Sequence, residues 1–153
     1  MKVLIATEGS EFSKSAVRGF CDMFRNVEGI EVKIISVVEP VVMPTEPFAM
    51  SPELVQQIDV AAERKADAYA EEAAALIGRE LPIAGGPETK VVMGIPAAAL
   101  VKEAEEWKAD LIVTGSHGHG FWKRAWLGSV SDAVVHHAPC SVLIVRQDGA
   151  HLS

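Results

Sequence analysis

Residues 110–118 read DLIVTGSHG, and this stretch decides which class of fold the chain can adopt. The segment from Asp110 to Thr114 has a continuous apolar centre, which is typical of a strand buried on both faces in a parallel sheet. Gly115 and Gly118 follow this strand, and nine residues separate Gly118 from Gly128. A buried strand that runs into a glycine-rich turn ahead of a helix indicates an α/β sheet.

Similar strands are predicted on both sides of this stretch, with helices between them. The predicted strands are Lys2–Thr7, Glu31–Val38, Glu88–Met93, Asp110–Thr114 and Ser141–Arg146; the predicted helices are Phe12–Phe24, Pro52 to about Ile77, Ala97–Trp107 and Ser129–His137. Ser51 is predicted to cap the long helix, with Pro52 at its first position. Ser129 and Asp132 are predicted to form a capping box at the start of the last helix.

This β-α-β-α-β-α-β-α-β order predicts one open five-stranded parallel sheet, with helices on both faces and a Rossmann-like arrangement. Such sheets bind ligands beyond the carboxyl ends of the strands, at the point where the strand order reverses. The turns after the first and fourth strands are therefore the predicted ligand site.

Length and charge narrow the classes of function. With 153 residues and 49% hydrophobic side chains, the chain is expected to form one domain over residues 1–148 and a short tail over 149–153. The 21 acidic against 14 basic residues give a net charge of −7, which disfavours binding to nucleic acid or to an anionic membrane. A bound anion would therefore need local backbone geometry to hold it.

The N-terminal residues MKVLIATEGS lack the apolar core of a signal peptide, and no stretch approaches the roughly 20 apolar residues of a membrane span. We therefore expect a cytoplasmic protein. Cys21 and Cys140 are too few for a disulfide framework and are predicted to be buried thiols.

The glycines around residues 115–128 suggest a phosphate site. Glycine can adopt positive φ and lets backbone N–H groups approach a ligand, so Gly115 and Gly118 could form an anion-binding nest. Gly128, Ser129 and Val130 would add the N–H groups and positive dipole end of a helix, and the hydroxyls of Ser129 and Ser131 could donate as well. The alternative is that these glycines form a tight turn and a helix cap.

The same residues make the chain resemble the universal stress protein family, in its ATP-binding branch. That branch carries G-x-x-G, nine residues, then G followed by Ser or Thr, and Gly115, Gly118, Gly128 and Ser129 match each position. The stretches LIATEGSE, GIP (94–96) and LGSVSDAVVHHAPCSVLIVR extend the likeness over nearly the whole chain. The resemblance implies strand order 3-2-1-4-5, ATP (or ADP or AMP) as ligand, and a homodimer through Ser141 to Arg146.

The resemblance also implies roles for individual residues. Ala6, Thr7 and Glu8 would lie beside the adenosine, Val37 would meet the adenine, Gly115 would lie near the ribose, and Gly118, Gly128, Ser129, Val130 and Ser131 would hold the phosphates. Ser116, His117 and His119, in the same glycine loop, complete the predicted binding set.

Two positions depart from the family pattern. Glu8 stands where the family usually has Asp, and it is a candidate ligand for Mg²⁺ that arrives with ATP; the alternative is a charge that stabilises the next helix. His119 follows the second glycine and would meet a phosphate when protonated, or else remain solvated in the loop.

Other candidate groups have a structural alternative. Trp122 and Trp126, beside Lys123 and Arg124, either cover the nucleotide or pack in the core or at a dimer contact. His136 and His137 are adjacent on a helix and point apart, so they predict no metal site.

Three functions remain open at this stage. The first is an ATP-binding regulatory module that acts on an unknown protein partner as a homodimer. The second is a weak ATP hydrolase or autophosphorylating protein, although the chain has no GxSxG, kinase or HExxH motif. The third is a ligand-free dimeric interaction protein.

Overall fold

The computed structural model describes residues 1–41, 51–117 and 127–146. In these ranges strands and helices alternate along the chain: β1 (Lys2–Ala6), α1 (Glu11–Phe24), β2 (Glu31–Val38), α2 (Pro52–Glu80), β3 (Glu88–Met93), α3 (Pro96–Trp107), β4 (Leu111–Gly115), α4 (Ser129–His137) and β5 (Ser141–Val145). The predicted order is confirmed, and most boundaries agree within one residue. The largest difference is at α2, which continues three residues beyond the predicted Ile77.

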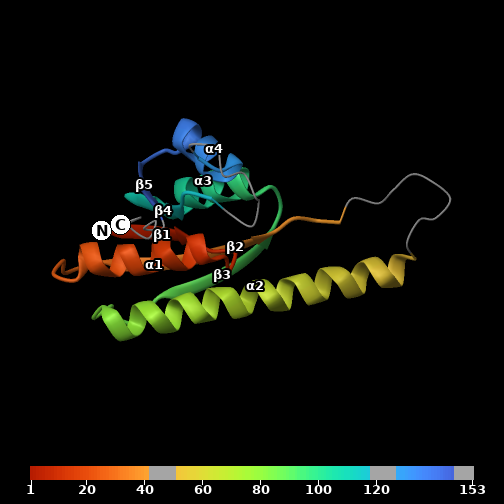
Figure 1. The fold of residues 1–153 in the computed structure, drawn as a ribbon, viewed down its shortest axis with the longest axis horizontal. Coiled ribbons are helices and arrows are strands. Elements are labelled where there is room, and N and C mark those ends of the chain that lie inside the picture. The colour runs from red at the N-terminus through yellow and green to blue at the C-terminus, as the bar shows by residue number, and fades with distance from the viewer. Residues whose placement is uncertain (42–50, 118–126, 147–153) are drawn as a thin grey trace, which may run out of the picture.

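The strands form one parallel sheet in the order β3-β2-β1-β4-β5, as the resemblance implied (Figure 1). β1 pairs with β2 on one side and with β4 on the other, so that Ile5 lies opposite Ile34 and Val113. The chain thus builds the sheet outward from β1 in one direction and then returns to extend it in the other. The reversal of direction occurs between β1 and β4.

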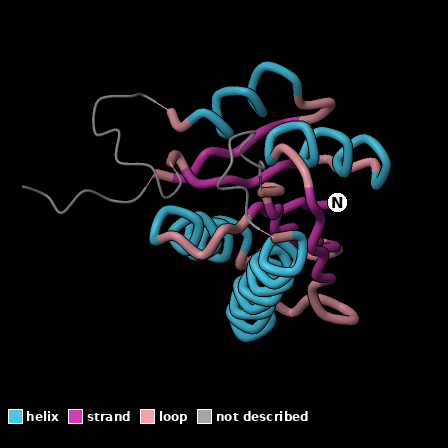
Figure 2. The backbone as a smooth tube through the Cα atoms, turned by 90° about the vertical axis from the view of Figure 1, so that its right-hand side faces the viewer, coloured by secondary structure: helices cyan, strands magenta, loops and turns pink. Residues whose placement is uncertain are grey.

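Two layers of helices cover the sheet (Figure 2). One core cluster lies on the α1 and α2 face around Phe20, Ile34 and Ile77, and the other lies on the α3 and α4 face around Ile35, Leu100 and Ile112. Alternating residues of a strand point to opposite faces, so each central strand supplies both clusters.

α2 begins as the sequence predicts. Pro52 occupies its first turn, and the Oγ of Ser51 accepts a hydrogen bond from the amide of Leu54 at 3.2 Å. Burial on this helix starts at Ala66, and the turns before it extend beyond the rest of the domain (Figure 1). The first part of α2 therefore contributes little to the core.

The two cysteines differ in burial. Cys21 is buried in the core, where burial, aided by Glu80 and Asp22, raises the pKa of its thiol to about 11. Cys140 is partly exposed, so the prediction that both thiols are buried holds for Cys21 and is wrong for Cys140. Cys140 lies in the turn that leads into β5, where it packs against the margin of the α3 and α4 cluster rather than inside it.

A cluster of ion pairs lies between the sheet and α3. Lys33 on β2 is 7% exposed, and its Nζ lies 2.9 Å from Glu103 Oε1, while Lys90 on β3 reaches the other oxygen of the same carboxylate at 2.5 Å. Trp107 covers the ammonium of Lys33, 4.8 Å from its ring centroid. One carboxylate thus joins α3 to two adjacent strands.

Burial and ion pairing shift the pKa values of Glu103 and Lys33 in opposite directions. Burial by itself would raise the pKa of Glu103, but the hydrogen bonds from Lys90 and Lys33 outweigh it and lower that pKa overall. Burial would likewise lower the pKa of Lys33, and the hydrogen bonds to Glu103 and Glu88 raise it instead. Both groups are therefore charged at neutral pH.

Within the described ranges, no helix is both long and apolar enough to cross a bilayer. The predicted tail at 149–153 lies outside those ranges, as do residues 42–50 and the tryptophans at 122 and 126.

Glu103→Gln is expected to destabilise the protein by about 3 kcal/mol, because it leaves a buried lysine without its main counter-charge. Urea unfolding at neutral pH measures the difference. Glu106→Gln on the same helix is the control, because its ion pair with Lys102 is exposed and should be worth less than about 1 kcal/mol. The stabilisation from Glu103 is present above its unfolded pKa and is lost as the pH falls through its lowered folded pKa. Equal effects of the two variants would contradict this account.

Candidate functional site

The turns after β1 and β4 lie next to each other at the carboxyl edge of the sheet. Because β1 and β4 are neighbouring parallel strands, the residues that follow Ala6 and Gly115 emerge on the same side. This is the point at which the strand order reverses, where open α/β sheets bind their ligands.

A cavity of about 720 Å³ opens at this edge. That volume is large enough for a nucleotide-sized ligand. Its walls come from β1, β2 and β4, from the turns beyond them, and from the starts of α3 and α4. The lining residues are Ala6, Thr7, Glu8, Ile35, Val37, Glu39, Pro96, Leu100, Thr114, Gly115, His117, Leu127, Gly128, Ser129, Val130 and Ser131.

Internal hydrogen bonds fix the turn after β1. The amide of Thr7 donates to the carbonyl of Ile35 at 3.0 Å, which extends the pairing with β2 beyond the strand. Ser10 caps α1 by accepting from the amide of Ser13 at 3.2 Å, and its hydroxyl donates to the carboxylate of Glu8. Glu8 is therefore held at the mouth of the cavity by the residue that starts α1.

Close packing, rather than an unusual backbone conformation, requires glycine at position 115. A Cβ built there would lie 2.8 Å from the carbonyl carbon and oxygen of Phe12 in α1. Neither Gly115 nor Gly128 uses the positive φ that glycine permits, and Gly128 has φ −71°. Gly9, in the turn after β1, does use it, with φ +76°.

The start of α4 faces the same cavity. Gly128 is the N-cap, with extended backbone, and the amide of Asp132 closes the first turn on its carbonyl at 2.9 Å. The amides of Ser129, Val130 and Ser131 have no carbonyl within the helix to donate to, as in any first turn. They supply the positive end of the helix dipole to one end of the cavity.

Three sequence-based assignments at α4 need correction. The predicted capping box is wrong, because Gly128 takes the cap position and Ser129 is already helical, with no side-chain cap hydrogen bond. The amide of Gly128 donates to the carbonyl of Ser116 at 2.7 Å. The hydroxyl of Ser131 is buried and donates to the carbonyl of Gly115 at 2.7 Å, so both protons are already used within the protein.

The cavity combines an apolar slot with an anion-binding end. Ala6, Ile35, Val37 and Leu100 provide apolar walls that suit a flat ring, and the amides of Ser129 and Val130 suit an oxyanion. In the described residues, no three His, Cys, Asp or Glu side chains are grouped to hold a metal ion. A metal at Glu8 would therefore need further ligands from the bound molecule itself.

The universal stress protein family profile matches residues 1–146. The chain belongs to the universal stress protein family. Universal stress protein MJ0531 of Methanocaldococcus jannaschii is 31% identical over 149 residues, which cover 95% of this chain and 82% of that protein.

Two solved members of the family share the fold. A universal stress protein in complex with cAMP superposes with a TM-score of 0.59 at 26% identity, over 95% of this chain and 96% of its own. An Arabidopsis thaliana member with AMP bound has a TM-score of 0.63 at 21% identity, over 97% and 93% of the two chains.

Most residues of the predicted binding set meet at the cavity. Ten of them line it: Ala6, Thr7, Glu8, Val37, Gly115, His117, Gly128, Ser129, Val130 and Ser131. Ser116 does not: it is buried, and its amide donates to the carbonyl of Val145 at 3.0 Å. Gly118 and His119 lie outside the described residues.

Six lining residues were not identified from the sequence: Ile35, Glu39, Pro96, Leu100, Thr114 and Leu127. Strand alternation could have found Ile35, since it lies two residues before Val37 and therefore on the same face of β2. Pro96 was visible within the family stretch GIP but had no assigned role. Leu100 depends on how α3 packs, which sequence spacing does not give.

Gly115→Ala is expected to cost about 1 to 3 kcal/mol in unfolding free energy, because the added methyl forces α1 away from β4. Gly78→Ala within α2 is the matched control: the nearest atom to its added Cβ is 3.9 Å away, and alanine favours a helix by about 0.5 to 1 kcal/mol. Urea denaturation of both variants measures the contrast. A Gly115 variant as stable as wild type would contradict the packing argument.

Proposed function

We propose that this protein binds ATP with Mg²⁺ and acts as a nucleotide-dependent regulatory module of the stress response. The proposal rests on one observation: a single cavity contains both an apolar slot and the N-terminus of α4. This cavity lies where the strand order of the sheet reverses. An adenine ring suits the slot, and a phosphate chain suits the free amides.

The proposed pose follows from the lining residues. The adenine lies against Val37 and Ile35, and the adenosine runs past Ala6, Thr7 and Glu8 toward Gly115. The amides of Ser129 and Val130, with Gly118 of the family motif, hold the phosphates, and Glu8 is available to the Mg²⁺. The cAMP and AMP bound to the two relatives support an adenine nucleotide, and ADP and AMP remain alternative ligands.

Ser129→Glu tests the phosphate end of the site. Ser129 is exposed at the first position of α4, where a carboxylate stabilises the helix yet repels a phosphate. Titration calorimetry of the nucleotide-stripped protein should show ATP binding weakened by more than about tenfold, from charge repulsion in a partly desolvated site. The loss should shrink from ATP to ADP to AMP.

Gln57→Glu, on the exposed first part of α2, is the control for added charge and should bind ATP as wild type does. If the stripped, folded wild type does not bind at millimolar ATP, the ligand-free interaction protein becomes the better interpretation. If ATP is turned over well above background, and Glu8→Gln abolishes that turnover, the weak hydrolase takes precedence over the regulatory module.

We also propose a homodimer formed through β5. β5 is an edge strand with a partly exposed apolar sequence, and unpaired edges invite association. Antiparallel pairing of two copies of Ser141 to Arg146 would cover both edges. A protein partner that distinguishes the nucleotide-bound from the nucleotide-free form would then bind a two-fold symmetric dimer in the cytoplasm.

Light scattering is expected to give twice the chain mass of 16.4 kDa for wild type. Ile144→Lys places a charge in the middle of the β5 edge and should shift the protein to monomer. Leu54→Lys is the matched control, since Leu54 is 43% exposed on the far part of α2 and should leave the dimer intact. A monomeric wild type would overturn the proposed interface.

A further inference from the structure

A second, smaller cavity lies between α1 and α2, on the opposite face of the sheet from α3 and α4. Its volume is about 150 Å³, and it is lined by Thr7, Gly9, Lys14, Val17, Arg18, Tyr69, Glu72, Ala73, Leu76 and Arg79. Thr7 lines both cavities, so the turn after β1 separates them. The family motif has no residue in this second cavity apart from that turn.

The charge of this cavity is opposite to that of the whole protein. Three cationic side chains line it against one carboxylate, and Lys14 and Glu72 are paired at 3.3 Å. In the described part of the chain, Arg18 and Arg79 enter no ion pair. Two guanidinium groups from different helices, both without an ion pair among the described residues, thus line one cavity. The net charge of the whole protein is −7.

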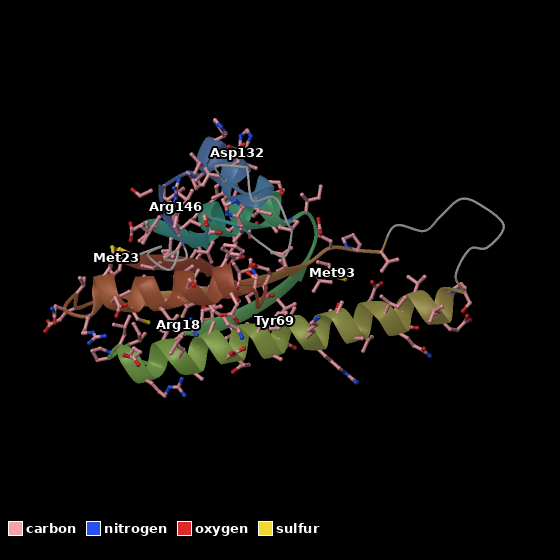
Figure 3. The ribbon with its side chains drawn as sticks, viewed as in Figure 1. Arg18, Met23, Tyr69, Met93, Asp132 and Arg146 are labelled. Atoms are coloured by element: carbon pink, nitrogen blue, oxygen red, sulfur yellow. The ribbon has the colours of Figure 1, made fainter. Side chains whose placement is uncertain are left out.

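The inner wall is closely packed and combines aromatic, aliphatic and charged side chains. The ring of Tyr69 packs directly on Gly9, where a Cβ would lie 2.3 to 2.5 Å from the ring atoms. Val17, Ala73 and Leu76 supply apolar surface behind the charges. Figure 3 shows Arg18 and Tyr69 extending into the space between α1 and α2.

We propose that this cavity binds a small oxyanion of the size and charge of inorganic phosphate. Arg18 from α1 and Arg79 from α2 donate to it from two sides, since guanidinium groups match the geometry of phosphate oxygens. A volume of about 150 Å³ admits such an ion but not a nucleotide, which needs the larger cavity.

The test is a titration of nucleotide-free protein with sodium phosphate, at constant ionic strength maintained with chloride and followed by amide chemical shifts. Saturable shifts are expected at Val17 and Leu76, which line the cavity beside the two arginines. The double variant Arg18→Gln, Arg79→Gln should weaken binding by at least about tenfold for each charge-assisted contact removed. Each single variant should fall between the double variant and wild type.

Arg64→Gln is the matched control. Arg64 is an exposed arginine on α2 that does not line the cavity, so its loss changes the net charge as much as either single variant does and should leave the affinity unchanged. All three arginines are exposed, and circular dichroism checks that each variant is folded. Because no nucleotide is present, shifts at residues beside Arg18 and Arg79 report this cavity, and shifts at Ser129 and Val130 report the larger one.

Three results would overturn the proposal. One is the absence of saturable shifts in wild type, and a second is binding that survives in the double variant. The third is a set of shifts confined to the amides of Ser129 and Val130, which would place the ion at the start of α4.

Discussion

The contact between Gly115 and Phe12 sets the distance between β4 and α1, and much of the rest of the domain depends on it. Since no side chain fits between them, the first turn of α1 lies directly on the end of β4. The turn after β1 is thereby brought to the edge where β4 ends. The hydroxyl of Ser131 then ties α4 to the same glycine through its carbonyl. Three elements of the larger cavity are positioned by one residue that has no side chain.

Most of the fold could be predicted from the sequence, because its signals are local. Short runs rich in apolar and β-branched residues identified the five strands, and the Ser51-Pro52 pair identified the start of α2. The last helix shows the limit of this reasoning. Gly128 and Ser129 both suit an N-cap, and the choice depended on the hydrogen bond from the amide of Gly128 to Ser116, which sequence spacing cannot reveal.

The larger cavity was partly predictable for the same reason. Strand ends and the glycine motif placed the turn after β1 and the start of α4 at one edge of the sheet, and the family resemblance added Val37. The motif could not show which polar groups remain available to a ligand. The hydroxyl of Ser131 and the amide of Gly128 both donate to carbonyl groups of the protein itself. The smaller cavity was not predictable, because Arg18 and Arg79 meet through the packing of α1 on α2 and share no local pattern.

The packing of Tyr69 on Gly9 has a practical consequence. The chain contains a single tyrosine, and its ring lies against the turn that forms a wall of both cavities. A spectroscopic signal from that ring, such as the resonance of a fluorine atom incorporated into tyrosine, would therefore come from one site and need no assignment. The protein carries a built-in reporter at the boundary between its two cavities, which could follow the occupancy of either one in real time.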